Sequence, residues 1–114
     1  MRTPVPVPHT FPAGSVIATD RLKLTLMYSD VATPTRKAKP YGVRGCEVYV
    51  SIADNAPTNP EDYRFAAFST RPPELLKFKS DEGGKTAHIL LRWVNTRGET
   101  GPWSQPISAT IPAV

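Results

Sequence analysis

The chain has 114 residues, 39% of them hydrophobic, which is enough for one domain with its own core and too few for a second domain of ordinary size. This composition argues against a disordered chain or a collagen repeat, and 13 prolines, about twice the average usage, argue against long helices. Lysine and arginine outnumber the acidic residues by 14 to 10, a net charge of +4, and no apolar run approaches the roughly 18 residues of a membrane span.

The chain begins with a proline-rich arm. In a β-strand alternate residues turn their N–H groups to opposite edges, so Pro4, Pro6 and Pro8 remove every donor from one edge. Val5, Val7 and His9 keep theirs on the other edge. Residues 1–13 are therefore a stiff linker, an edge strand of the chain's own sandwich, or a strand donated to another copy. The domain itself is expected at residues 14–114. The N-terminus lacks the basic and then apolar pattern of a signal peptide, so the compartment stays open.

Two alternating segments follow. Leucine or tyrosine occupies every second position of residues 22–28, which predicts a strand with one buried face. Residues 46–52 alternate in the same way and place Cys46 on the apolar side. A single cysteine cannot form an internal disulfide or a thiolate metal cluster, and this position favours a buried core residue over a reactive thiol.

Positive charge is concentrated between these segments, at Arg36, Lys37, Lys39 and Arg44. Surfaces that bind single-stranded nucleic acid interleave such charges with aromatic side chains on which bases stack, and here only Tyr41 is available. The pattern favours a solvent-exposed basic loop over a nucleic-acid interface. Arg36, Lys37, Lys39 and Tyr41 remain a secondary candidate site for a partner.

The next segment, residues 54–62, is dense in turn-forming residues. Asp54, Asn55, Asn59, Glu61 and Asp62 carry oxygen atoms of the kind that bind calcium. Their spacing matches no calcium loop, whereas Asn59 and Pro60 fit the cap and the first residue of a helix. We therefore expect one helical turn here and no metal site.

The rest of the chain continues the strand pattern. Strands are expected at residues 63–69, 75–79, 86–94 and 107–111, with a turn at residues 80–84. Within the strand at residues 86–94, alternation places Trp93 inside. About seven short strands, with turn signals roughly every ten residues and no sustained period of 3.6, predict an all-β, immunoglobulin-like antiparallel sandwich.

The end of the chain resembles a fibronectin type III domain. Leu91-Arg92-Trp93-Val94-Asn95 is similar to strand F of that family, and Gly98-Glu99-Thr100-Gly101-Pro102-Trp103-Ser104 to the following loop and the start of the last strand. The resemblance covers about residues 14–112 and implies that family's antiparallel β-sandwich. Within it, residues 22–28, 42–52, 63–69 and 75–79 would be strands B, C, C′ and E.

Two shorter segments, residues 42–47 and 85–104, also resemble the C-terminal ends of uncharacterised bacterial proteins. In those proteins a helical region and a proline-rich linker come first. This resemblance implies a C-terminal module and supplies no activity.

Catalytic chemistry finds little support in the sequence. His9 lies in the arm, and His88 lies on the face of its strand opposite Ile89, Leu91 and Trp93. Neither histidine has a motif partner, and no nucleophile elbow or glycine-rich phosphate loop is present. We therefore expect neither an enzyme nor a cofactor site.

Two features after residue 95 are candidates for partner binding. Arg97-Gly98-Glu99 lies where some adhesive modules of the resembled family carry a receptor-binding tripeptide, but glutamate is one methylene longer than the aspartate such receptors require, which favours a plain hairpin tip. Trp103, at a strand start, covers the end of the sandwich or faces a partner. The candidate partner-binding residues are Val5, Val7, Arg97, Glu99 and Trp103.

The expected function is a non-enzymatic interaction or structural module, whose protein partners include other copies of the chain assembled through the arm. The main alternative is a carbohydrate-binding or surface-binding accessory domain, which requires an exposed aromatic platform. Tyr41, Tyr49 and Trp103 are the candidates for that platform.

Overall fold

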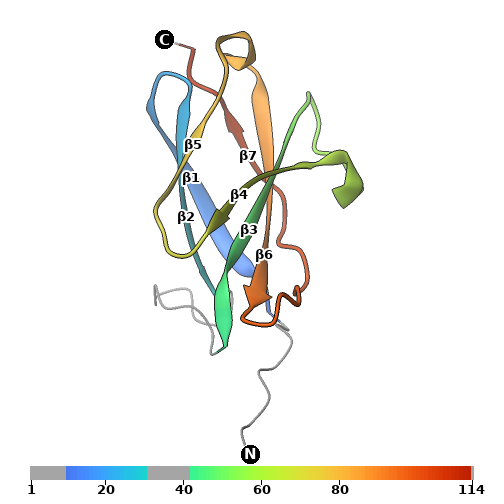
Figure 1. Ribbon diagram of the computed structural model, residues 1–114. Helices are drawn as coiled ribbons and strands as arrows, with labels where there is room; N and C mark the ends of the chain where they lie inside the picture. The colour runs from blue at the N-terminus through green and yellow to red at the C-terminus, as the bar shows by residue number, and fades with distance from the viewer. Residues whose placement is uncertain (1–9, 31–41, 114) are drawn as a thin grey trace, which may run out of the picture.

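Two antiparallel sheets pack face to face in the computed structural model, which describes residues 10–30 and 42–113 (Figure 1). The strands in this part of the chain are β1 (Pro12–Asp20), β2 (Lys23–Asp30), β3 (Val43–Ile52), β4 (Arg64–Ser69), β5 (Glu74–Lys77), β6 (Thr86–Asn95) and β7 (Ile107–Thr110). Two single-turn 3-10 helices, η1 (Pro60–Asp62) and η2 (Ser80–Glu82), lie in the connections. The three-stranded sheet has the order β1-β2-β5, and the four-stranded sheet has the order β4-β3-β6-β7. The expected all-β sandwich is confirmed.

The core lies between the sheets because alternate residues of β2, β3 and β6 turn apolar side chains inward. Trp93 is only 1% exposed, as alternation predicts. Its ring meets that of Tyr28 edge-on, with 5.7 Å between centroids, and its Nε1 atom donates to Asp30 Oδ1 at 3.2 Å. The buried indole N–H therefore has an acceptor. Cys46 is also fully buried. None of the described residues forms a helix with the length and apolar character needed to cross a bilayer.

The sequence pattern did not predict β1, because this strand consists mostly of small residues with little apolar alternation. A Cβ atom at Gly14 would lie 2.7 Å from Ile107 Cδ1, so glycine lets β1 pack closely against the four-stranded sheet. Leu22, expected as the first residue of a strand, lies instead in the turn between β1 and β2 with a φ of 61°. β1 itself begins at Pro12, whose side chain is buried.

The helical turn expected after Asn59 is present as η1. Asn59 Oδ1 accepts a hydrogen bond from the Glu61 backbone N–H at 3.0 Å, so this side chain caps the turn. Tyr63, expected to open a strand, ends the turn instead, with its backbone N–H donating to the Pro60 carbonyl at 3.1 Å. No group of three or more His, Cys, Asp or Glu side chains within residues 10–30 and 42–113 is arranged to hold a metal ion.

Candidate functional site

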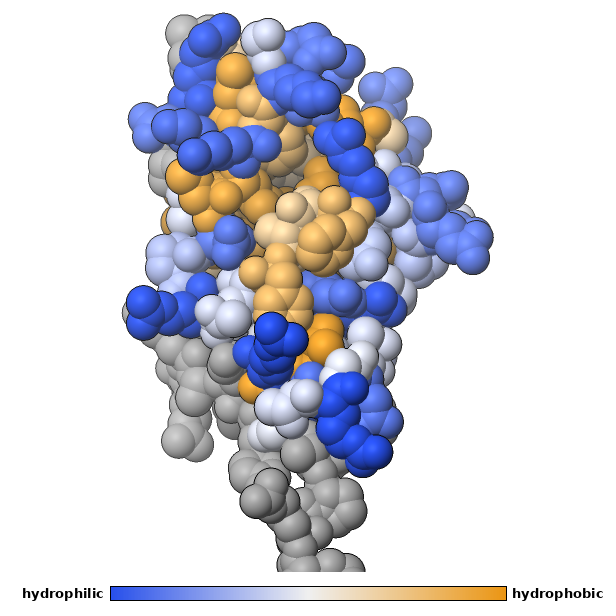
Figure 2. Space-filling model, viewed as in Figure 1, coloured by the Kyte–Doolittle hydropathy of each residue, from blue (hydrophilic) through white to orange (hydrophobic). Residues whose placement is uncertain are grey.

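The two sheets separate where β4 and β5 end them. β4 is the edge of the four-stranded sheet, β5 is the edge of the three-stranded sheet, and the two strands are not paired with each other. Between them lies a cavity of about 420 Å³, here called the edge opening, which reaches the buried side chains of Val50 and Leu76. Apolar side chains gather over β4 and β5, with hydrophilic ones around them (Figure 2). The lining residues are Val50, Arg64, Ala66, Ala67, Glu74, Leu75, Leu76, Lys77 and Phe78.

Large apolar side chains are exposed beside this opening. Leu75 on β5 is 44% exposed and Phe65 on β4 is 53% exposed. Leu75 also lies in one cross-strand row with Thr25 and Ile17 on the outer face of the three-stranded sheet, and Ile17 is 57% exposed. None of these residues belongs to the site predicted from the sequence. The sequence does contain a signal for Leu75. Leu75 and Leu76 are consecutive in a strand and must face opposite sides, so one of them points away from the core.

The backbone of β5 has one free edge. All four of its residues are in unbroken antiparallel register with β2, and the Phe78 N–H extends this ladder by donating to the Leu22 carbonyl at 2.9 Å. Since alternate residues turn their N–H and C=O groups to opposite edges, those of Leu75 and Lys77 point away from β2. The expected strand at residues 75–79 ends early because the Lys79 N–H, on that same outer edge, donates to Glu82 Oε1 at 2.8 Å.

Positive charge lies on the outer side of the edge opening. Lys77 is directly opposite Lys23 in the ladder, and Lys23 in turn lies opposite Asp20 on β1. The ion pairs within the described residues join Arg64 to Glu82, Arg92 to Glu47 and Arg97 to Glu99, so neither lysine takes part in one. Two like charges in directly opposed positions destabilise a ladder. Lys77 is therefore a cation at the free edge that forms no ion pair with the described residues.

The outer face of the four-stranded sheet carries an aromatic cluster made of Tyr49, Phe65, Trp103 and Arg92. The Tyr49 ring meets Phe65 at 5.6 Å and Trp103 at 5.0 Å between centroids, both nearly at right angles. The Arg92 guanidinium lies 4.2 Å from the centre of the Trp103 ring, and its Nε atom lies 2.6 Å from Glu47 Oε1. Trp103 thus packs onto the sheet. Tyr49 and Trp103 do not share the flat surface expected of a sugar-binding platform.

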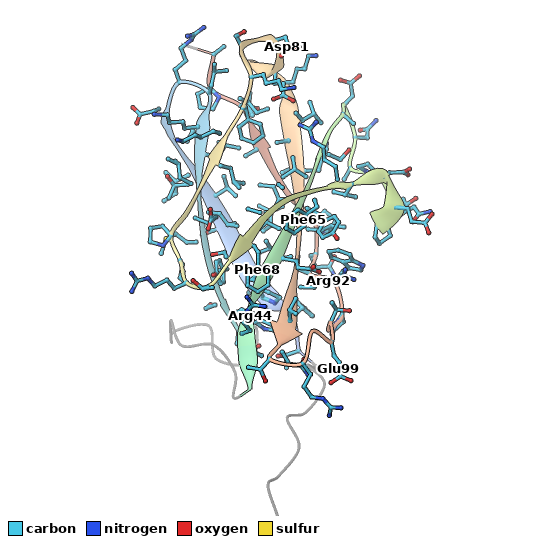
Figure 3. All side chains as sticks on the ribbon, in the orientation of Figure 1. Arg44, Phe65, Phe68, Asp81, Arg92 and Glu99 are labelled. Atoms are coloured by element: carbon cyan, nitrogen blue, oxygen red, sulfur yellow. The ribbon has the colours of Figure 1, made fainter. Side chains whose placement is uncertain are left out.

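The turn after β6 is the hairpin tip that the sequence predicted. Asn95 organises it, because its Oδ1 atom accepts from the Arg97 and Glu99 backbone N–H groups at 3.0 and 2.9 Å, and its Nδ2 atom donates to Glu99 Oε1 at 2.9 Å. Gly98 has a φ of 85°, a conformation that favours glycine. Glu99 is therefore partly engaged within its own loop, and it lies at the far end of the molecule from η2, where Asp81 is labelled (Figure 3).

Buried polar groups are paired in ways that serve structure. The two ring nitrogens of His88 lie 2.7 Å from Ser108 Oγ and 2.9 Å from the Ala53 carbonyl, and the ring is 3% exposed. Among residues 10–30 and 42–113, its hydrogen-bond partners are one hydroxyl and one backbone carbonyl, and neither is a carboxylate. Burial raises the pKa of the Cys46 thiol to about 12, so the thiol is protonated at neutral pH and shielded from reagents.

The remaining sequence-predicted site residues divide between two groups. Val5, Val7, Arg36, Lys37, Lys39 and Tyr41 lie outside the described residues. Arg44, the fourth basic residue of that loop region, is exposed on β3 and lies beside Phe68, with its guanidinium carbon 5.2 Å from the ring centre (Figure 3). Of the predicted partner-binding residues, the structure places Arg97 and Glu99 in one loop and brings neither to the edge opening.

Comparison with known proteins gives a structural likeness only. No family model and no curated protein matches the sequence. Among solved structures, the chicken CNTN1 FN1-FN3 domains match with a TM-score of 0.67 at 16% identity, over 93% of this chain and 33% of that one. The twitchin kinase region of C. elegans matches with a TM-score of 0.61 at 15% identity, over 92% of this chain and 17% of that one. A fibronectin type III domain derived from the human KIAA0970 protein matches with a TM-score of 0.58 at 15% identity, over 92% and 72%.

The chain thus spans a third or less of the first two structures. The resemblance to bacterial C-terminal modules stays a prediction. The sheet orders β1-β2-β5 and β4-β3-β6-β7 correspond to strands A, B and E packed on strands C′, C, F and G, which agrees with the assignments made from the sequence. The chain therefore has the fold of a fibronectin type III domain.

Proposed function

We propose that this domain is a non-enzymatic interaction module that binds a protein partner at the edge opening. The observation that carries the proposal is the cavity of about 420 Å³ between two unpaired strands, whose floor reaches the core at Val50 and Leu76 and whose rim exposes Leu75. Contiguous apolar surface of this kind, surrounded by polar residues, is typical of interaction sites. The pairing of His88 with Ser108 and Ala53, and the burial of Cys46, support a role without catalysis.

Selection from a phage-displayed library of random peptides tests this proposal. The matched variant is Ala66→Gln combined with Leu75→Ser, which narrows the opening and removes its apolar rim at two exposed positions. Ile17→Ser is the control, because it removes similar exposed apolar surface from a strand that does not line the opening. Peptides enriched on the original chain should bind the double variant about tenfold more weakly, a loss of about 1.4 kcal/mol, and the control unchanged. Circular dichroism checks that all three fold.

A library that yields no binder would contradict the proposal. Binders that retain their affinity for the double variant would also contradict it, because they would recognise some other surface.

Assembly through the arm is a second proposal, and the sequence alone supports it. Val5 and Val7 keep their donors on one edge, and two N–H bonds at about 1 kcal/mol each, with two valines at about 1.5 kcal/mol each, favour association with another copy. Truncation should remove residues 1–9 only, because the Thr10 hydroxyl donates to Asp30 and β1 begins at Pro12.

Light scattering at high concentration measures the outcome. Loss of self-association with an unchanged thermal midpoint supports a donated strand. Unchanged assembly, or monomers for both forms, contradicts it. Unfolding of the truncated chain would make the arm part of its own sandwich.

A further inference from the structure

We infer that β5 accepts an acidic extended peptide as an added antiparallel strand, which makes the edge opening a strand-addition site. This inference rests on the proposed function and names the chemistry of the partner at the same site. It is carried by three features of the opening, namely the free backbone edge of β5, the cavity behind it that reaches Val50 and Leu76, and the charge of Lys77, which forms no ion pair with the described residues.

The backbone of β5 is suited to receive a strand. Leu75 and Lys77 turn both their N–H and C=O groups to the free edge, and register with β2 is unbroken over all four residues. β4, on the other side of the opening, has an irregular register at Ala66, where two residues of β4 advance against one step of β3. Bulges of this kind blunt an edge against pairing. Of the two edges, β5 is therefore the one that can continue a ladder.

The side chains of an added strand have defined surroundings. Its residue opposite Leu76 points, as Leu76 does, into the space between the sheets, which Val50, Ala67 and Phe78 line. Its residue opposite Leu75 lies on the outer face and extends the row made by Ile17, Thr25 and Leu75. Two successive apolar residues in the peptide would thus bury surface on opposite faces.

Charge selects the third position. The residue opposite Lys77 lies on the outer face, where Lys77 already faces Lys23. An acidic side chain there neutralises a lysine that takes part in no ion pair within residues 10–30 and 42–113. A second copy of this chain would instead bring its own Lys77 and a net charge of +4 to the same edge. From its N-terminus, the antiparallel peptide therefore reads acidic, large apolar, apolar.

The probe is the blocked peptide acetyl-Thr-Ser-Glu-Ile-Val-Thr-Ser-amide, titrated into the full chain and followed by the backbone amide shifts of Leu75 and Lys77. In the inferred pairing, the valine N–H of the peptide points toward β5 and the isoleucine N–H points away. Methylation of the valine nitrogen should weaken binding by about fivefold or more, and methylation of the isoleucine nitrogen should leave it unchanged. Equal losses from both methylations, or absent shifts at Leu75 and Lys77, would overturn the inference.

A charge exchange gives the second readout. Lys77→Glu should weaken the probe by about threefold or more and should strengthen a peptide in which lysine replaces its glutamate. Lys85→Glu is the matched control, because it makes the same charge exchange at an exposed position that does not line the opening. The acidic partner is refuted if Lys77→Glu leaves the affinity for the probe unchanged. It is also refuted if the original chain self-associates at this edge and Lys77→Glu abolishes that association. If library peptides bind at the opening but this probe does not bind, strand addition is refuted. The proposed function as an interaction module is then still supported.

Discussion

Replacing Leu91 with alanine tests whether β6 is the centre of the core. Leu91 is fully buried, and the change deletes three carbon atoms, which at about 0.8 kcal/mol each removes roughly 2.4 kcal/mol of transfer free energy. A cavity adds to that loss, because Leu91 packs where β1 passes at Gly14 and a Cβ atom there would already lie 2.8 Å from Leu91 Cδ1. We expect the free energy of unfolding to fall by about 3 to 4 kcal/mol.

Arg92→Ala is the matched comparison at the next position of the strand. It removes an ion pair with Glu47 whose side chains are 23% and 20% exposed, together with a cation–π contact to Trp103. Partial exposure limits the expected cost to about 1 to 2 kcal/mol. Urea unfolding of both variants at pH 7 measures the two losses, and a domain stable by about 5 to 15 kcal/mol tolerates either one. A smaller loss for Leu91→Ala than for Arg92→Ala would refute the described register of β6.

Three further outcomes are expected. Cys46 should react with a thiol reagent only after denaturation, because it is buried and burial raises its pKa to about 12; rapid labelling of the native chain would place it elsewhere. Burial likewise raises the pKa of Tyr28 from 10.0 to about 12, so the unfolded chain releases this proton first and stability present below about pH 10 is lost as the pH rises toward 12. Tyr28→Phe should flatten the fall of the urea midpoint over that interval, and parallel curves would contradict the assignment. Asn95→Ala removes three hydrogen bonds from the turn after β6 and should cost about 2 kcal/mol in urea unfolding, whereas Thr96→Ala at the exposed neighbouring position should cost less than about 0.5 kcal/mol; similar losses would mean that the Asn95 side chain does not organise the turn.

Local patterns were sufficient for most of the fold. Alternation predicts that Cys46 and Trp93 are buried, and Asn59 with Pro60 predicts the turn at η1. Each of these features depends on residues that are neighbours in the sequence. β1 could not be predicted in this way, because Gly14 is there for its close approach to Ile107, which lies far away in the sequence.

The edge opening could not be predicted from the sequence for a similar reason. It exists only because β4 and β5, consecutive in the chain, end different sheets, and no pattern within either segment records how far apart two edges lie. The arrangement of Arg92 on Trp103 is likewise a product of tertiary packing, since eleven positions of sequence separate the two residues. The candidate site can therefore be recognised only in the assembled sandwich.

The turn that Asn95 organises is fastened at both ends. Before it, the Asn95 N–H donates to the Glu99 carbonyl at 3.0 Å, and after it the Gly101 N–H donates to the Trp93 carbonyl at 2.9 Å. Ser104 then exchanges hydrogen bonds with the Leu91 backbone at 2.8 and 2.9 Å, and Trp103 stacks on Arg92. These bonds hold the two ends of the turn on β6, so the exposed tip at residues 96–98 offers a graft position at which foreign loop sequences can be displayed while β7 keeps its place.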